Sequence, residues 1–479
     1  MLGAISRHQN KRNGNAEERA MSAPDVIDVT DVIERQRRNG LVLTVLILST
    51  TMMFLDGYDL QAMAFAAPSI IRAWGIQRAA LGIVFSAGIF GILVGGLVFG
   101  SLGDRIGRRL SIVASMLVFG SFTLATVWAS DITSLIVLRF LAGIGIGGLS
   151  PLCYALNLEY APSRYRGTAV AIIMVGYVAG SSIGGFIAAG LVPQFGWTIV
   201  FWIGGVLPLL GAALCYFALP ESIKFLVVRN REPAEVARIL NRIEPSLQAH
   251  ATTHFVLRDE ASAGSAGTGL VSQLATLFDG RLAVITPFLW VAYIASSITM
   301  FFLNSWTPIL AEASGHTPAQ AAMGLTVFSL GGAVGGLTIG RVLDRFGVIA
   351  IAIVPLIASP LVASLVWAGL GDSTYLATMV CVGFFVVGGH QGLNSSVGQF
   401  YSSTNRTTAV GWALSVAKIG SISGPLVAGI LIAQQLPFSS LFLLAALPPL
   451  VVAACVLALG ISQRKQSAAA RKIDQAATA

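Results

Sequence analysis

Apolar segments about 20 residues long recur along this chain, and they restrict its fold more than any other feature. A helix needs ~20 apolar residues to cross the ~30 Å hydrocarbon core of a bilayer. Segments of that length fall into two groups of six, separated by a polar stretch. Their approximate bounds are 40–62, 80–100, 110–128, 134–157, 167–190 and 198–218, then 282–307, 320–341, 348–369, 374–397, 407–432 and 438–461. The sequence therefore predicts an all-α membrane protein with 12 transmembrane helices in two six-helix bundles.

Composition supports lipid as the main environment. Only 11% of the residues are charged, whereas a soluble domain is about a quarter charged. The 52 glycines suit helices that pack closely in lipid, because glycine lets two backbones approach. Gly91, Gly95, Gly96 and Gly100 form two such ladders of small residues. The four cysteines are far apart in apolar segments, so they indicate neither a disulfide framework nor a metal site.

The distribution of basic residues predicts the orientation. Lys and Arg are retained on the cytoplasmic side of a membrane. Placing both tails, the segment 219–281 and the loops 101–109, 158–166, 340–347 and 400–406 on that side collects 26 of the 30 basic residues. The loops on the opposite side hold Arg72 and Arg78. Both termini are therefore expected in the cytoplasm, and topology explains the net charge of +8 without a nucleic-acid partner.

Five regions follow from these patterns. We expect a disordered cytoplasmic tail over 1–38, an N-terminal half over 39–218, a cytoplasmic linker over 219–281, a C-terminal half over 282–461 and a second tail over 462–479. The first 38 residues lack the apolar core of a secretory signal, and the sequence leaves open whether translation starts at Met1 or Met21. The linker contains one amphipathic stretch near 234–242.

The two halves are related by an internal repeat. A shift of 240 residues superposes Gly100, Asp104, Arg105 and Gly107 on Gly340, Asp344, Arg345 and Gly347, and it also superposes Gly91 on Gly331 and Gly180 on Gly420. Because six spans separate equivalent positions, the halves have the same orientation. A parallel repeat of this kind predicts a substrate site between the halves, near the middle of the bilayer.

The loop Gly-Ser-Leu-Gly-Asp-Arg-Ile-Gly-Arg-Arg at 100–109 resembles the signature loop of the major facilitator superfamily. The segment 340–347 resembles a degenerate copy of it. A carboxylate at a helix end can pair with a nearby Arg or cap another helix, and such a contact can bias which side of a transporter opens. We interpret five residues as gating residues: Gly100, Asp104, Arg105, Asp344 and Arg345.

Shorter motifs resemble the aromatic acid and proton symporter family of this superfamily. They are Asp56-Gly-Tyr-Asp59, Pro220-Glu-Ser222 and the segment 411–421. The resemblance implies a multi-pass protein of the bacterial inner membrane that imports a small aromatic carboxylate, such as a hydroxybenzoate, together with protons. One position departs from the family, which usually has Arg where this chain has Lys418. Lys cannot make the planar two-pronged contact that Arg makes with a carboxylate.

Ionisable residues inside the spans are candidates for function, because a charge in mid-bilayer costs at least ~2.5–3.5 kcal/mol. Asp56 and Asp59 lie three residues apart on one helix face, and nearby carboxylates in apolar surroundings suit reversible protonation. We assign proton coupling to Asp56, Asp59 and Glu159. The sequence leaves open that one aspartate forms an ion pair with Arg139. Glu159 could instead form a gating ion pair, with Arg164 or Arg166.

Lys418 is the first candidate to bind an anionic substrate, and Arg139 is the second. Polar and aromatic side chains suit recognition of a ring and its hydroxyls. The further substrate-binding candidates are Tyr58, His390, Gln391, Asn394, Trp306 and Trp412, and Tyr293 and Asn304 belong to the same broader set. Packing inside the membrane is the alternative interpretation for each aromatic residue.

Other functions find less support in the sequence. The run Gly143-Ile-Gly-Ile-Gly-Gly148 imitates a dinucleotide fingerprint but lies in an apolar span, and neither a phosphate-binding loop nor a zinc-binding helix motif occurs. We therefore expect no cofactor and no enzyme activity. An efflux antiporter, a sugar porter and a transporter-like sensor remain alternatives. The first usually has Gly-Pro in its fifth span and the second Gln-Gln in its seventh, and both signatures are absent. The expected partners are the aromatic acid, protons and the lipid bilayer, with the protein acting as a monomer.

Overall fold

The computed structural model describes residues 26–36, 39–229, 231–257, 274–367, 371–401 and 403–461. Within these residues, 11 helical segments are long and apolar enough to cross a membrane. They contain α3 (Gly40–Trp74), α4 (Leu81–Ile106), α5 (Arg108–Ala125), α6 (Ile132–Tyr160), α7 (Arg166–Phe195), α8 (Thr198–Ala218), α12 (Leu282–Ala313), α13 (Pro318–Phe346), α15 (Asp372–Phe400), α16 (Ser403–Ala433) and α17 (Phe438–Ala445), which opens the segment Phe438–Ile461. The predicted span 348–369 corresponds to α14 (Val348–Ser364), whose 17 residues fall short of the ~20 that a full crossing needs.

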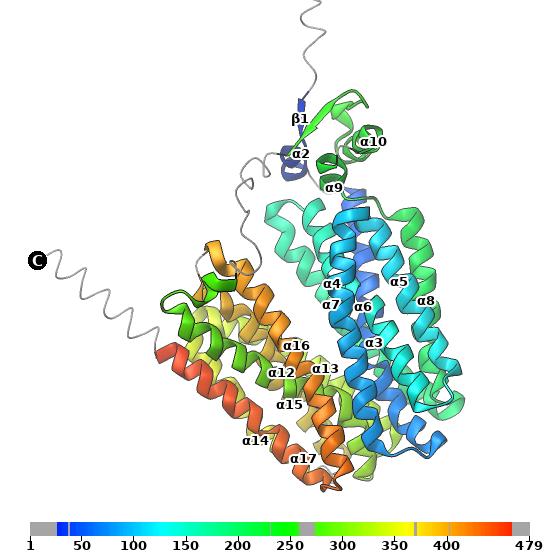
Figure 1. Ribbon diagram of the computed structural model, residues 1–479, viewed down its shortest axis with the longest axis vertical. Coiled ribbons are helices and arrows are strands. Elements are labelled where there is room, and N and C mark those ends of the chain that lie inside the picture. Colours follow the sequence, from blue (N-terminus) through cyan, green and yellow to red (C-terminus); the bar gives the residue numbers. More distant parts are fainter. Residues whose placement is uncertain are drawn as a thin grey trace, which may run out of the picture.

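The helices gather in two groups, α3 to α8 and α12 to α17 (Figure 1). In the first group α4 packs on α6, α3 on α7 and α5 on α8. In the second, α13 packs on α15, α12 on α16 and α14 on α15. Contacts of α7 with α13, of α4 with α16 and of α3 with α12 connect the groups. Short 3-10 helices precede or follow several of the spans: η1 (Arg78–Ala80), η2 (Thr126–Trp128), η3 (Ser163–Tyr165), η5 (Thr276–Phe278) and η6 (Leu365–Trp367).

The 240-residue repeat extends to the packing of the helices. A Cβ atom added to Gly91 would lie 2.1 Å from the carbonyl oxygen of Phe140, and one added to Gly331 would lie 2.2 Å from that of Val380. The residue numbers of the second contact are thus those of the first plus 240. The relation also holds for Gly95 with Ile144 against Gly335 with Phe384, and for Gly180 with Phe54 against Gly420 with Ile294. Only glycine permits such close backbone contact, which explains why these glycines recur.

Several contacts between the groups lie in the second halves of α3 and α12 and in the first halves of α4 and α13. The Gln61 side chain donates a 2.7 Å hydrogen bond to the Ser329 hydroxyl, and the Ser86 hydroxyl donates one of 2.8 Å to the carbonyl oxygen of Ile422. Arg72, in the last turn of α3, forms an ion pair with Glu312, near the end of α12. We call this region the joined end of the helix groups. Arg72 and Glu312 are 240 residues apart, so they are equivalent positions of the repeat.

A peripheral subdomain lies beyond the opposite end of α3 to α8 (Figure 1). It contains β1 (Val26–Asp28), α2 (Val29–Arg35), α9 (Ile223–Val228), α10 (Pro233–Ile243), η4 (Pro245–Leu247) and β2 (His254–Val256). The two strands pair in parallel, with Val26 opposite His254. The helix α2 buries Val29, Val32 and Ile33, a stripe typical of an amphipathic helix.

This subdomain corrects two predictions. A disordered tail over 1–38 is wrong for residues 26–36, because the linker supplies a strand partner for β1 and an apolar surface for α2. The fold is all-α except for this small parallel sheet. The amphipathic stretch expected near 234–242 is confirmed as α10. Residues 1–25, 258–273 and 462–479 lie outside the described residues.

Candidate functional site

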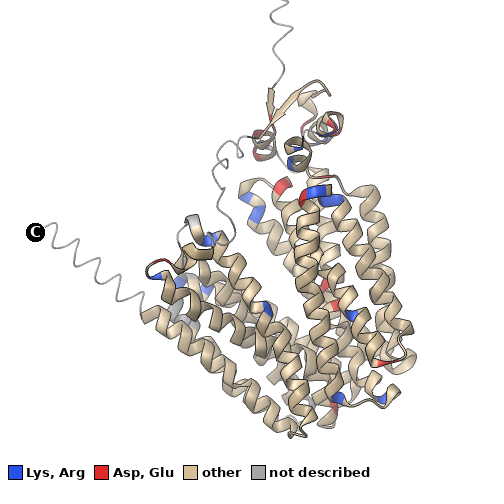
Figure 2. Ribbon diagram, in the orientation of Figure 1, with Lys and Arg blue, Asp and Glu red and all other residues tan. Residues whose placement is uncertain are grey.

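Charged residues are sparse along the spans and more frequent at their ends (Figure 2). An exception is an ion pair between α3 and α6. Arg139 Nη1 lies 3.2 Å from Asp59 Oδ2, and their side chains are only 5% and 2% exposed. The Thr123 hydroxyl donates to Asp59 and accepts from Arg139 Nη2. The Arg139 guanidinium also lies 4.9 Å from the centre of the Phe201 ring. The pairing of one aspartate with Arg139, which the sequence left open, is therefore realised by Asp59.

Asp56 lies one turn before Asp59 on α3 and has different surroundings. It is buried, and its Oδ2 accepts a 2.9 Å hydrogen bond from the Ser150 hydroxyl of α6. Across the boundary between the helix groups it interacts electrostatically with Lys418 of α16. Lys418 is half-buried, and within the described part of the chain no hydrogen bond or ion pair engages its ammonium group. A cation is thus held near a carboxylate of the other group without direct pairing.

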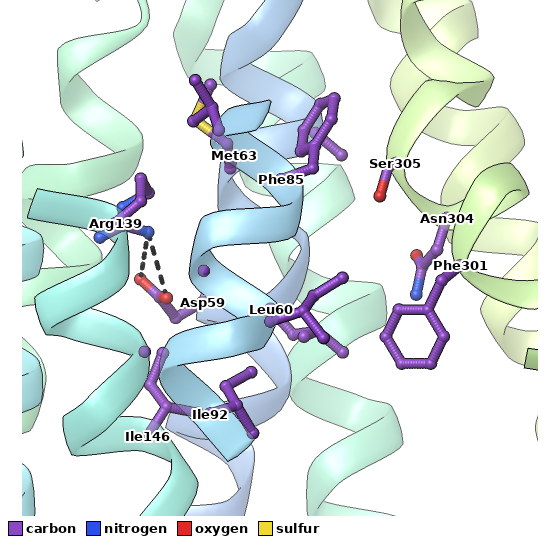
Figure 3. A pocket seen from close by; sticks show the side chains of 15 residues that line it. Asp59, Leu60, Met63, Phe85, Ile92, Arg139, Ile146, Phe301, Asn304 and Ser305 are labelled. Atoms are coloured by element: carbon purple, nitrogen blue, oxygen red, sulfur yellow. Dashed lines mark hydrogen bonds and ion pairs between the residues drawn. The ribbon is translucent and has the colours of Figure 1, made fainter. Parts of the chain in front are cut away.

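A cavity extends from the Asp59–Arg139 pair to the second helix group (Figure 3). The pair lies on one wall, and Phe301, Asn304 and Ser305 of α12 form the opposite wall. Between them are mainly apolar residues: Leu60, Met63, Ala64, Val84, Phe85, Gly88, Ile89, Ile92, Gly143 and Ile146. An apolar cleft with a few polar groups is typical of a site for a small organic molecule.

The other substrate-binding candidates lie outside this cavity. The Tyr58 hydroxyl donates to the carbonyl oxygen of Val200, and Trp306 Nε1 donates to that of Pro425, so their polar atoms are used within their own helix groups. Trp412 stacks on Trp290. Gln391 packs beside Gly336, and Asn394 has a buried amide oxygen without a partner among the described residues.

His390 lines a second cavity, within the α12 to α17 group. Its Nδ1 lies 3.0 Å from the Ser296 hydroxyl, and the ring meets Tyr293 edge-on. Lys418 is close enough to interact with it electrostatically. The structure therefore brings His390 near Lys418 and leaves it apart from the Asp59–Arg139 pair.

One gating candidate, Asp104, lies near the peripheral subdomain, where Arg229 Nη2 donates to its backbone carbonyl oxygen. Asp104 forms a 2.7 Å ion pair with Arg108, whose Nε lies 3.5 Å from Glu159 Oε1. The sequence left open a gating ion pair of Glu159 with Arg164 or Arg166, and in the structure its partner is Arg108. Arg166 pairs with Glu34 instead, and Arg164 donates to the carbonyl oxygen of Gln36, because the folded segment 26–36 occupies that loop.

The remaining gating candidates make fewer contacts. Gly100 faces open space, and Arg105 is exposed. Arg345 lies over the neighbouring Phe346 ring, and the side chain of Asp344 is outside the described part of the structure.

Glu221, rather than Asp104, caps a helix N-terminus. Its Oε1 accepts from the backbone N–H groups of Arg108 and Arg109, the first residues of α5, and from that of Ser222. Burial raises the pKa of this carboxyl above its usual value of 4.5, although the three N–H donors oppose the shift. The cap is possible because Gly107 has φ +102°, and a Cβ atom there would lie 2.4 Å from Glu221 Oε2.

A second carboxylate ties the peripheral subdomain to the loop after α6. Glu34 accepts hydrogen bonds from the hydroxyl and the backbone N–H of Ser163. These bonds, the hydroxyl first, hold the pKa of Glu34 below its usual value of 4.5, and Arg166 adds to the effect. Among the residues that the structure describes, no group of three or more His, Cys, Asp or Glu could hold a metal ion.

Comparison with known proteins identifies the family. The model of the Major Facilitator Superfamily matches residues 49–280 and 289–478. The chain belongs to the major facilitator superfamily. Like other members of this superfamily, it is a multi-pass membrane transporter and not an enzyme.

Within the superfamily, the chain is similar to transporters of aromatic acids. It is 36% identical to the 4-hydroxybenzoate transporter PcaK of Pseudomonas putida over 83% of this chain and 88% of that protein. It is 32% identical to a gallate transporter of the same species, over 91% and 95% of the two chains. Among solved structures it resembles a bacterial homologue of the lysosomal transporter Spinster, in an inward-facing and unoccupied conformation. The TM-score is 0.64, the identity is 16%, and 88% and 96% of the two chains are covered.

Sequence reasoning missed several contacts of this superfamily member. Thr123 and Ser150, which bind the two aspartates, are common residues without a distinctive pattern. Glu312 had a usable signal, since the 240-residue shift superposes it on the basic Arg72. Asn304, a lone amide in an otherwise apolar stretch of α12, was already in the broader set of candidates.

Proposed function

We propose that this chain imports small aromatic carboxylates, such as a hydroxybenzoate, in symport with protons. The similarity to proteins named for 4-hydroxybenzoate and gallate transport, along nearly the whole chain, is the observation that carries the proposal. Lys418 supports it, because a cation that has no direct partner among the described residues, near the boundary of the two helix groups, suits an anionic substrate.

Asp56 and Lys418 suggest how proton and substrate are coupled. When Asp56 is ionised it attracts Lys418 and competes with the carboxylate of a substrate. Protonation of Asp56 removes that competition, so a proton and an anion would be bound together. Release of the substrate would let Asp56 give up its proton and attract Lys418 again. Arg139 is already neutralised by Asp59, which favours Asp56 as the residue that exchanges protons.

Other assigned residues would serve recognition or gating. Tyr58, His390, Gln391, Asn394, Trp306 and Trp412 would shape the surroundings of the substrate. The contacts of Glu159 and Asp104 with Arg108 favour a gating function for that cluster, and the equivalent Asp344 and Arg345 would act in the second half. The ion pair of Arg72 with Glu312 would stabilise the closed joined end during alternating access.

The same proposal includes the topology. Twelve spans, with α14 as the ninth, would form two six-helix halves over 39–218 and 282–461, joined by the segment 219–281. The basic loops favour a cytoplasmic position for both termini and the peripheral subdomain, and the joined end would then face the outside. In a bacterium this places the protein in the inner membrane, where a monomer would be the functional unit.

Uptake by the purified protein in liposomes tests the proposal. Labelled 4-hydroxybenzoate should accumulate when the outside is acidic, and a protonophore should abolish accumulation. Lys418→Met should weaken apparent affinity strongly, whereas Lys418→Arg keeps the cation and should retain uptake. Asp56→Asn should still exchange labelled for unlabelled substrate, but it should not accumulate substrate in response to a proton gradient.

Three results would contradict parts of the proposal. Absence of uptake of benzoate, 4-hydroxybenzoate and gallate by folded protein would refute the substrate class. Substrate accumulation that does not depend on the proton gradient would refute symport. Undiminished proton-driven uptake by Asp59→Asn would remove Asp59 from the coupling residues and leave it a structural partner of Arg139.

A further inference from the structure

The wall of the cavity opposite Arg139 contains an unused hydrogen-bond acceptor. Asn304 of α12 is only 9% exposed, and its side chain lines the cavity on the side facing Asp59 (Figure 3). Its Oδ1 has no hydrogen-bond partner among the described residues. A buried acceptor left unpaired is destabilising, so a ligand that donates a hydrogen bond here would recover that free energy.

The other polar groups of the cavity are already engaged or differently placed. Asp59 accepts from Arg139 and Thr123, and Arg139 donates to Asp59 and Thr123. Ser305 lies beside Asn304 on the same wall. Asn304 is therefore the polar group of this wall whose buried acceptor atom has no partner.

The chemistry of an aromatic acid limits what can fill this position. An ionised carboxylate only accepts hydrogen bonds, and the edge of an unsubstituted ring offers no strong donor. A phenolic hydroxyl donates one. Phe301 on the same wall, with Leu60 and Phe85 nearby, provides the apolar surface that a ring needs.

We propose that Asn304 accepts a hydrogen bond from a ring hydroxyl of the substrate and thereby selects hydroxylated aromatic acids over unsubstituted ones. This inference rests on the proposed function. It adds a narrower substrate class and the residue that recognises it. A site built to bind a hydroxyl discriminates strongly against an analogue without one, because its buried polar group is then left unpaired. Benzoate should thus be a poorer substrate than 4-hydroxybenzoate.

Competition uptake in proteoliposomes tests this inference. Unlabelled benzoate and unlabelled 4-hydroxybenzoate are compared as competitors of labelled 4-hydroxybenzoate, for wild type and for Asn304→Leu. The wild type should prefer the hydroxylated acid about tenfold or more, corresponding to about 1.4 kcal/mol. In Asn304→Leu the preference should fall about tenfold, through loss of affinity for 4-hydroxybenzoate while benzoate binds as before. Asn304→Ala serves as a second variant if the leucine does not fold.

Thr338→Leu is the control, because Thr338 is an exposed residue of α13 whose hydroxyl bonds only to its own helix. It should keep the wild-type preference. If the wild type transports both acids and Asn304→Leu changes both affinities equally, or neither, the inference is refuted and the proposed function stands. If the folded wild type transports no aromatic acid, the proposed function fails and the inference falls with it.

Discussion

Removing the charge of Asp59 should destabilise the protein far more than removing that of Asp56. Both aspartates are buried on α3, but Asp59 neutralises Arg139, and both side chains of that pair are almost inaccessible. Breaking a buried pair by removing one partner costs about 3–5 kcal/mol, because the remaining charge is uncompensated. Against a total stability of about 5–15 kcal/mol, Asp59→Asn should therefore lower the free energy of unfolding by about a fifth or more.

Asp56→Asn is the matched control. Asp56 has one hydrogen bond, from Ser150, and no direct ion pair in the described structure. Its loss should cost about 1 kcal/mol, the net value of a typical hydrogen bond. The double variant Asp59→Asn with Arg139→Gln removes both charges and should recover most of the stability that the single variant loses.

Thermal and denaturant unfolding in detergent, followed by the fluorescence of an environment-sensitive dye, would measure these differences. The reasoning is refuted if Asp59→Asn and Asp56→Asn unfold alike. It is equally refuted if the double variant is no more stable than Asp59→Asn, since Arg139 would then not need its partner.

Three further predictions concern the ends of the helix groups. Gly107→Ala should destabilise the protein by about 1–3 kcal/mol, because φ +102° with ψ 162° suits only glycine; Gly167→Ala, in open space within α7, should not lower the melting temperature. Arg72→Glu should open the joined end and speed the labelling of a cysteine introduced at the buried Thr326, and adding Glu312→Arg should restore slow labelling. An ion pair that is partly exposed contributes about 1 kcal/mol, which predicts a roughly fivefold change in labelling rate. Equal labelling rates of all variants would contradict this prediction. The lowered pKa of Glu34 contributes stability that is present above pH 4.5 and is lost as the pH falls through the folded-state pKa. The protease resistance of residues 26–36 should therefore fall on acidification in the wild type. A Glu34→Gln variant that shows the same fall would refute this prediction.

The sequence could predict features that depend on spacing along one helix or on the repeat. Gly91 and Gly95 predicted close helix contacts, and in the structure carbonyl oxygens lie 2.1 and 2.0 Å from where their Cβ atoms would be. The run Gly143–Gly148 likewise packs against α4 and α5. Lipid as solvent makes such patterns informative, since close backbone approach needs small residues wherever helices meet.

Features that depend on which helix faces meet could not be predicted. The proximity of Lys418 to Asp56 joins residues from different helix groups, and nothing in either local sequence specifies the other. The subdomain at 26–36 was missed for a related reason. Its three-residue strand and single apolar stripe are too short to be stable alone, and they are held by segments more than 200 residues away. The partner of Glu159 could not be chosen from the sequence either, because Arg164 and Arg166 bind residues of this distant segment.

The pairing of Arg72 with Glu312 also bears on how the two halves came to differ. In a symmetric dimer of identical halves, a residue that meets its own equivalent near the symmetry axis meets a copy of itself. Two arginines or two glutamates there would repel each other. An attractive ion pair between equivalent positions can therefore exist only after the two halves have diverged in sequence. The joined end thus contains a stabilising ion pair that became possible after duplication. No assembly of identical half-transporters could have formed it.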